Sequence, residues 1–97
     1  MAGTVRIDAG AVRALRGGRS LLPSGVRVAE GAFGFGDAVA IVGPDGAPVG
    51  RGLVNYAAEA LARIAGRRTH EIADLLGAKD FDEVVHRDNL VLTAADG

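Results

Sequence analysis

Short runs of alternating or helically spaced apolar residues follow one another along the chain, separated by glycine, proline and aspartate. Val5-Arg6-Ile7 alternates, which predicts a short strand. Asp8 precedes residues 9–16, whose apolar positions share one face at helical spacing. The Asp8 carboxylate can accept first-turn amides, and Gly17-Gly18 can end the helix. The chain is therefore expected to open with a strand followed by a capped helix.

Three further apolar runs predict strands in the middle of the chain. They cover residues 25–29, 38–42 and roughly 48–54. Gly43-Pro44-Asp45-Gly46 separates the last two, with proline preset for a turn and Gly46 able to take a positive φ. This pattern predicts a hairpin between the last two of these strands.

The hydrophobic period changes to that of a helix after residue 56. Residues 57–65 place Leu61 and Ile64 on one face and end at Gly66. Thr69 is the expected cap of a second short helix that ends at Gly77. Residues 83–93 are β-rich again, so the chain should close with strand structure.

Strands dominate this pattern and the helices are short, which predicts a mixed α/β, mainly β fold built as a small barrel-like sheet. The 97 residues suffice for one domain, 1–97, with a modest core, and 48% of them are hydrophobic. The sequence contains no internal repeat and no low-complexity tract. An ordinary globular domain is expected.

The absence of cysteine excludes disulfides, thiolate metal sites and cysteine nucleophiles. His70 and His86 are the only histidines, too few for a multi-histidine metal site, so no metal site is expected. No apolar run reaches the ~20 residues of a membrane span, and no signal-peptide pattern precedes the fold. We therefore expect a cytoplasmic protein with no membrane partner.

The net charge of −1 argues against a strongly basic nucleic-acid binder, but the charges are unevenly distributed along the chain. Residues 1–30 contain five arginines and two acidic residues, a net of +3. Residues 71–83 contain five acidic residues and Lys79, a net of −4. This asymmetry either forms real surface patches or disappears when the chain folds.

Three short motifs could suggest chemistry, and each has a simpler interpretation. His86-Arg87-Asp88 matches the start of a kinase catalytic loop, but Thr93 stands where that loop has its magnesium-binding asparagine. A turn before the last strand explains it better. Gly34-Phe35-Gly36-Asp37 is half of a dinucleotide fingerprint with no helix after it, so a hairpin connection is expected. Asp80 and Asp82 could suggest metal binding, but an exposed, solvated loop is the better interpretation of this acidic pair. No catalytic residue is expected in the chain.

Several segments together resemble the PUA domain of bacterial glutamate 5-kinases, from about residue 4 to 92. The most specific are Ser20-Leu21-Leu22-Pro23 and Val85-His86-Arg87-Asp88-Asn89. Asp8-Ala9-Gly10-Ala11, the Phe33 to Asp37 element and Arg51-Gly52-Leu53-Val54-Asn55-Tyr56 agree as well. The resemblance implies a PUA-type pseudo-barrel with short helices.

The resemblance also implies a function. Glutamate 5-kinase transfers phosphate from ATP to the side-chain carboxylate of glutamate, the first step of proline biosynthesis. Its catalytic amino-acid-kinase domain has no counterpart in this chain, so the chain should be an accessory, non-enzymatic module without a cofactor. ATP and magnesium are expected only in the kinase domain. That domain is the first expected partner, and structured RNA is the second.

PUA domains of other enzymes bind RNA in a groove around the first helix and the neighbouring strands. The corresponding helix here is 9–16, from whose outward face Arg13 and Arg16 should project. The candidate RNA-binding residues are Gly10, Arg13, Arg16, Arg19, Ser20 and Arg87. A solvated helix face is the alternative interpretation of the arginines. Gly10 is unusual within a helix, so close backbone approach to a strand or a ligand is expected there.

Two positions depart from the family pattern. Phe35 stands where a basic or polar residue is usual, which weakens the case for a phosphate contact there. Ala57-Ala58 replace the usual helix cap, so Asn55 is the expected substitute. Two other functions remain open: a stand-alone RNA-binding PUA protein, and a protein-interaction module that uses the same groove.

Overall fold

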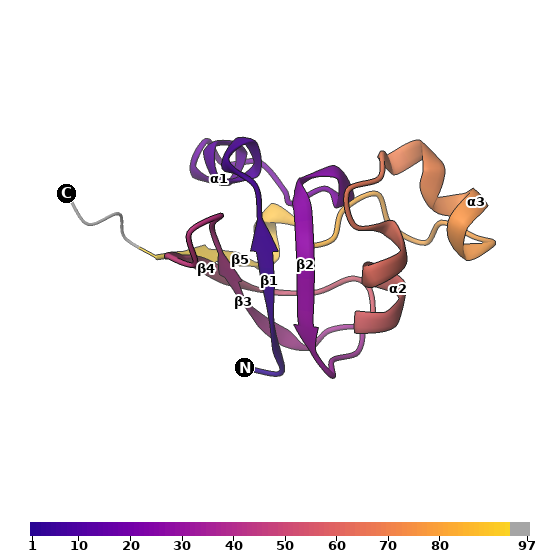
Figure 1. Cartoon of the computed structure of the whole chain (residues 1–97), viewed down its shortest axis with the longest axis horizontal. Helices are drawn as coiled ribbons and strands as arrows, with labels where there is room; N and C mark the ends of the chain where they lie inside the picture. The colour runs from indigo at the N-terminus through magenta and orange to yellow at the C-terminus, as the bar shows by residue number, and fades with distance from the viewer. Residues whose placement is uncertain (94–97) are drawn as a thin grey trace.

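The computed structural model describes residues 1–93, whose strands form a five-stranded sheet (Figure 1). The strands are β1 (Gly3–Ile7), β2 (Val26–Gly31), β3 (Ala38–Val42), β4 (Pro48–Leu53) and β5 (Leu90–Leu92). Their spatial order is β2-β1-β3-β4-β5. β1 and β3 run parallel, and the other neighbouring pairs are antiparallel. The mixed, mainly β fold expected from the sequence is confirmed.

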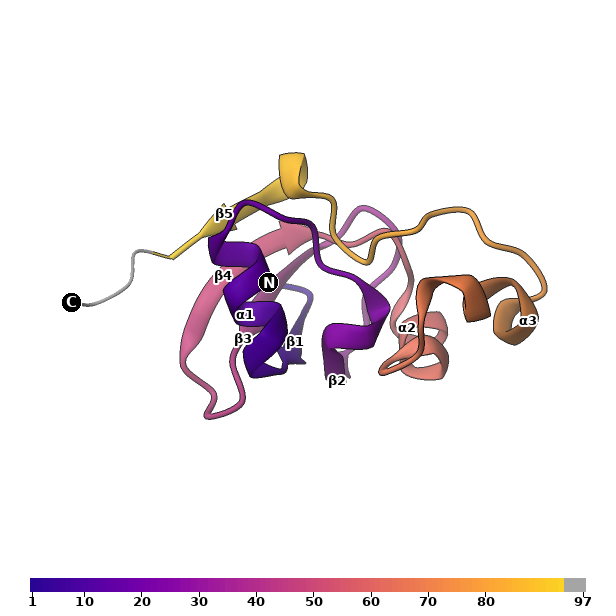
Figure 2. The ribbon, with the colours of Figure 1, turned by 90° about the horizontal axis from the view of Figure 1, so that it is seen from above.

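Three short helices lie around this sheet. They are α1 (Ala9–Arg16), α2 (Ala58–Ile64) and α3 (Ile72–Leu76), accompanied by 3-10 turns at Pro23–Gly25, Thr69–Glu71 and Arg87–Asn89. Figures 1 and 2 place α1 toward one end of the molecule and α3 at the other. The predicted short helices are therefore present.

A β-bridge between Leu21 and Val85 draws the two sheet edges toward each other. The Leu21 amide donates to the Val85 carbonyl at 2.9 Å, and the Val84 amide donates to the Leu21 carbonyl at 2.7 Å. Leu21 precedes β2 and Val85 precedes β5, the two edge strands. The bridge therefore curls the sheet toward a barrel and satisfies backbone groups between the strands.

The core lies on the concave side of this sheet and is apolar. Val5 of β1 and Ile41 of β3 are fully buried, because alternate residues of a strand point to the same face. Leu61 and Ile64 of α2 are fully buried against them. Among residues 1–93 no charged side chain is buried. The charged residues are thus left on the surface, where they can define binding sites.

The predicted caps and turns are largely confirmed. Asp8 Oδ1 accepts the Ala11 amide at 2.7 Å and caps α1. Gly46, in the β3–β4 hairpin, has a φ of +84°, and Gly77 ends α3 with a φ of +82°. Both glycines stand in the left-handed region, which other residues rarely adopt. The turn expected at His86-Arg87-Asp88 is present as the 3-10 turn before β5.

Two predicted caps are wrong. Asn55 does not cap α2: its Nδ2 donates to the Glu83 carbonyl at 3.0 Å, and Ala57 stands at the cap position without a side-chain bond. Thr69 does not cap the second helix either, because it lies inside a 3-10 turn that precedes α3. There Glu71 Oε1 accepts the Arg68 amide at 3.0 Å. A tertiary hydrogen bond engages Asn55, and a hydrogen bond within the turn, from the Arg68 amide to Glu71, replaces the cap expected from Thr69.

The interpretation of residues 34–37 as a hairpin connection is also wrong. β2 and β3 both pair with β1 and lie on opposite sides of it, so residues 32–37 cross over β1. The crossing is fixed by the Gly36 amide, which donates to the Val54 carbonyl at 2.7 Å. The sequence marks a turn there but carries no information on which strands it joins.

Close backbone approach occurs at Gly25 rather than at Gly10. A Cβ added to Gly25 would lie 2.6 Å from the Ala11 Cβ, whereas one added to Gly10 would meet Asp8 Oδ1 at 3.4 Å. Gly10 is exposed on α1, and no strand lies within 4 Å of that position. The expected approach of a strand to Gly10 is therefore wrong, and the approach of a ligand stays a prediction.

We predict that Gly25→Ala destabilises the fold, because the new methyl group must push α1 away from the turn. The expected loss of unfolding free energy is about 1–3 kcal/mol, as for other overpacked sites. Gly10→Ala is the matched control, and it should be neutral or slightly stabilising because alanine favours the helix. Urea unfolding of both variants measures the difference. Equal midpoints would show that α1 does not pack closely on Gly25.

Candidate functional site

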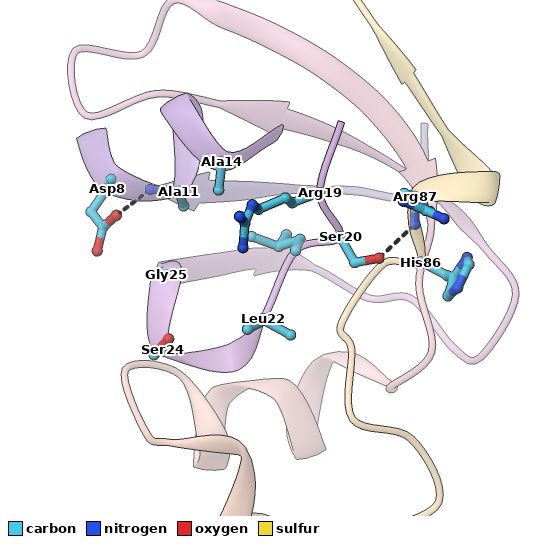
Figure 3. Close-up of a pocket in the computed structure, with 12 residues that line it drawn as sticks. Asp8, Ala11, Ala14, Arg19, Ser20, Leu22, Ser24, Gly25, His86 and Arg87 are labelled. Atoms are coloured by element: carbon cyan, nitrogen blue, oxygen red, sulfur yellow. Dashed lines mark hydrogen bonds between the residues drawn. The ribbon is translucent and has the colours of Figure 1, made fainter. Parts of the chain in front are cut away.

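A groove of about 650 Å³ lies between α1, the segment that follows it and the turn before β5 (Figure 3). One wall is the first half of α1 with Asp8, and the other is the segment from Arg19 to Gly25. His86 and Arg87 form its far end. The lining residues are Asp8, Gly10, Ala11, Ala14, Arg19, Ser20, Leu21, Leu22, Ser24, Gly25, His86 and Arg87.

The groove owes its shape to two contacts. Gly25 lets the 3-10 turn approach Ala11 of α1, which sets the separation of the two walls. At the far end Ser20 Oγ accepts the Arg87 amide at 2.9 Å, next to the Leu21–Val85 bridge. Segments 67 residues apart in the sequence are thereby held side by side.

Four of the six predicted binding residues line this groove: Gly10, Arg19, Ser20 and Arg87. Arg19 and Arg87 are exposed. Figure 3 shows the Arg19 side chain extending along the groove between Ala14 and Leu22. Because a guanidinium group remains charged at all physiological pH values, two fixed positive charges stand at this site.

Arg13 and Arg16 do not line the groove. Arg13 lies beside it on α1: its Nη2 is 3.9 Å from the position of a Gly10 Cβ. Arg16 is directed elsewhere, since its Nη1 donates to the Thr93 carbonyl at 3.2 Å. The helical face predicted for these two arginines is exposed, as expected, but only Arg13 adjoins the groove.

His86 brings a further polar group that the sequence analysis did not assign to the site. Its Nδ1 accepts the Asp88 amide at 3.1 Å, so the neutral ring carries its proton on Nε2. Nε2 lies 3.8 Å from Glu83 Oε2. His86 directly precedes Arg87 in a segment that resembles the family, and this position could have indicated that His86 belongs to the site.

The apolar part of the groove lining comprises Ala11, Ala14, Leu21 and Leu22. Leu22 is 44% exposed, a large value for a leucine. The polar part comprises two serine hydroxyls, His86, the two guanidinium groups and the Asp8 carboxylate. Such a surface suits a ligand that is anionic on one side and flat or apolar on the other.

Nothing else among the described residues points to chemistry. Within residues 1–93 no group of three or more acidic or histidine side chains is placed to hold a metal ion. Asp80 and Asp82 lie in an exposed loop, where Lys79 Nζ contacts Asp82 Oδ1 at 2.9 Å. In that same part of the chain, no helix has the length and apolar character needed to cross a bilayer.

The chain is similar to proteins of known family over nearly its whole length. The PUA domain family matches residues 3–76. Glutamate 5-kinase of Moorella thermoacetica is 52% identical over 91 residues, which cover 93% of this chain and 24% of that protein. Glutamate 5-kinase of Stutzerimonas stutzeri is 57% identical over the same length, with the same coverage of both chains. The chain thus spans about a quarter of the length of the curated relatives it matches.

A solved structure supports the same fold. It is a PUA domain from Aeropyrum pernix K1 in a tartrate complex, 30% identical to this chain with a TM-score of 0.67. The match covers 90% of this chain and 42% of the other.

We predict that Ser20→Ala weakens the far end of the groove, because it leaves the Arg87 amide without its acceptor. The expected loss is about 1 kcal/mol, and a change of that size lowers Tm by about 4–8 °C in a domain of this length. Ser24→Ala is the control, since Ser24 also lines the groove but makes no side-chain hydrogen bond within residues 1–93. Thermal melts compare them. Equal Tm values for both variants would contradict a structural role for the Ser20 bond.

Proposed function

The chain belongs to the PUA domain family, and we propose that it is the carboxy-terminal accessory domain of a glutamate 5-kinase. Identity of 50–57% over 91–96 residues to glutamate 5-kinases carries this proposal. The catalytic reaction, phosphoryl transfer from ATP to glutamate for proline biosynthesis, then belongs to an amino-acid-kinase domain that forms the rest of such proteins. ATP and magnesium would bind there, and the complete protein would work in the cytoplasm.

The size of the native gene product tests this proposal directly. A relative of which the chain spans 24% has about four times its mass of 9.8 kDa, so the native product should have about 40 kDa. Mass spectrometry of the protein captured from cell extract by an antibody to this chain measures it. A product of the chain's own mass would favour the stand-alone PUA protein instead.

We further propose that the groove along α1 binds RNA. Two guanidinium groups, Arg19 and Arg87, can each hold a phosphate through paired hydrogen bonds. The exposed Leu22 side chain suits contact with a base or ribose, because it offers apolar surface beside the two guanidinium groups. A nucleic acid offers phosphate and base in one repeating unit, and RNA is the nucleic acid that PUA domains of other enzymes bind. Its contacts with this domain would be few, in keeping with the net charge of −1.

The isolated chain is predicted to have no kinase activity. It corresponds to a quarter of the glutamate 5-kinases that it matches. Its groove contains neither a phosphate-binding glycine loop followed by lysine nor an acidic cluster among the described residues. Incubation with glutamate and radiolabelled ATP should give no glutamyl phosphate and no phosphate release. ATP-dependent formation of glutamyl phosphate by the purified chain would show that catalytic residues lie within it.

The salt dependence of RNA binding is predicted to depend on Arg19 and Arg87. Each phosphate contact on single-stranded RNA contributes about −0.7 to the slope of log K against log salt, so Arg19→Gln with Arg87→Gln should reduce it by about 1.4. The thermal stability should change little, because both side chains are exposed. Fluorescence anisotropy with a labelled single-stranded RNA measures the slope.

Arg27→Gln with Arg51→Gln is the matched control. Both arginines are exposed, but neither lines the groove. This variant loses the same total charge and should keep the slope of the parent. Equal loss of slope in both double variants would mean that the attraction is diffuse. An unchanged slope in the first variant would place any RNA site away from Arg19 and Arg87.

A further inference from the structure

A second surface feature lies away from the groove, where the loop before β3 meets the segment after α3. The Phe35 ring stacks on Phe81 with centroids 5.5 Å apart, and Phe81 meets Tyr56 edge-on at 6.2 Å. Phe35 remains 67% exposed, whereas Tyr56 is buried. We call these three rings the aromatic ledge. A large exposed ring that stacks on a half-buried one is typical of an interaction surface rather than of a core.

The aromatic ledge is held in place by its own hydrogen bonds. Tyr56 Oη accepts the Phe81 amide at 3.1 Å and donates to the Phe81 carbonyl. On the other side, Asp37 Oδ2 accepts the Gly34 amide at 2.8 Å and closes the turn that carries Phe35. A partner that covers the Phe35 ring therefore has little loop entropy to overcome.

A hollow of about 420 Å³ adjoins the aromatic ledge between α2 and α3, and its lining has a formal net charge of −1. Glu59 and Asp80 line it and form no ion pair within residues 1–93. Arg63 also lines it, and its Nη2 donates to the uncharged Leu75 carbonyl at 2.6 Å, so two carboxylates stand against one guanidinium. Carboxylates repel phosphates, so this surface favours a protein partner with basic side chains over a nucleic acid.

The amino end of the chain lies at the same edge of the sheet as the loop that carries Phe35. The Ala2 amide donates to the Ala38 carbonyl at 2.9 Å, and Gly3 pairs with Gly31. Residues 32–37 join these two contact points. A polypeptide that precedes residue 1 would therefore enter at the end of β1 where the crossing segment 32–37 lies.

We propose that the aromatic ledge and the acidic hollow are the surface on which the preceding kinase domain docks. This inference rests on the proposed function, which supplies the preceding chain. An apolar side chain of that domain covers Phe35, and lysine or arginine side chains reach Glu59 and Asp80. α1, which forms one wall of the groove, lies apart from α2 and α3 (Figures 1 and 2), so the groove would remain open in this arrangement.

Hydrogen–deuterium exchange of the complete glutamate 5-kinase and of the 97-residue chain tests this docking surface. Amides of residues 33–38 and 78–83 should exchange about tenfold more slowly in the complete enzyme, while those around Arg19 remain unchanged. Phe35→Ser combined with Glu59→Gln should remove the difference. Val28→Thr is the control, because Val28 is 46% exposed in β2 but lies outside the aromatic ledge and the hollow, and it should keep the protection.

Each alternative outcome has a distinct meaning. Equal exchange in a complete enzyme of the expected mass would overturn the docking surface and leave the proposed function intact. A native product of only this chain's mass would overturn both. If Phe35→Ser weakens binding of single-stranded RNA to the isolated chain, the aromatic ledge belongs to an RNA surface and the docking inference is wrong.

Discussion

The hydrogen bonds between Leu21 and the Val84-Val85 segment are the interaction on which the rest of the structure depends. They join two stretches of chain more than 60 residues apart, and closing so long a loop has a considerable entropic cost. Buried Leu21, Val84 and Val85 offset that cost by removing apolar surface from water. The same contact curls the sheet, closes the core and places Arg87 beside Ser20. Fold and groove therefore have a common origin.

Small residues then determine how closely the elements around this contact approach. Gly25 admits α1 to within van der Waals distance of the turn before β2. Gly52 does the same on the other side, where a Cβ would lie 2.5 Å from Val85 Cγ1. Protein interiors are close-packed, so a side chain at either glycine would force these elements apart. The width of the groove is consequently set by the packing that stabilises the fold.

Much of the fold could be predicted from the sequence because it is encoded locally. The Asp8 cap, the turn ending at Gly46 and the periodicity of residues 57–65 each depend on neighbouring residues. The errors arose where distant partners decide. The Asn55 side chain donates a hydrogen bond to the Glu83 carbonyl instead of capping α2, and the crossing over β1 depends on the order of the strands in the sheet. For the groove, the sequence predicted Arg16, Arg19, Ser20 and Arg87 as binding residues alike. Only the tertiary structure shows that Arg19, Ser20 and Arg87 line the groove, whereas Arg16 contacts Thr93.

The groove and the hollow differ in the sign of their formal charge. Asp8, Arg19 and Arg87 line the groove, for a net of +1, and Glu59, Asp80 and Arg63 line the hollow, for a net of −1. Arg13 and Arg19 lie at or beside the groove on α1, whereas Glu59 and Asp80 line the hollow between α2 and α3. A net charge near zero conceals this arrangement, because opposite charges on separate faces cancel only in the total. For the RNA binding proposed above, this arrangement would direct phosphates to the groove rather than to the hollow. Phe35 would suit the docking proposed for the other end, because an aromatic ring adds contact area for a protein neighbour without adding a positive charge beside the hollow.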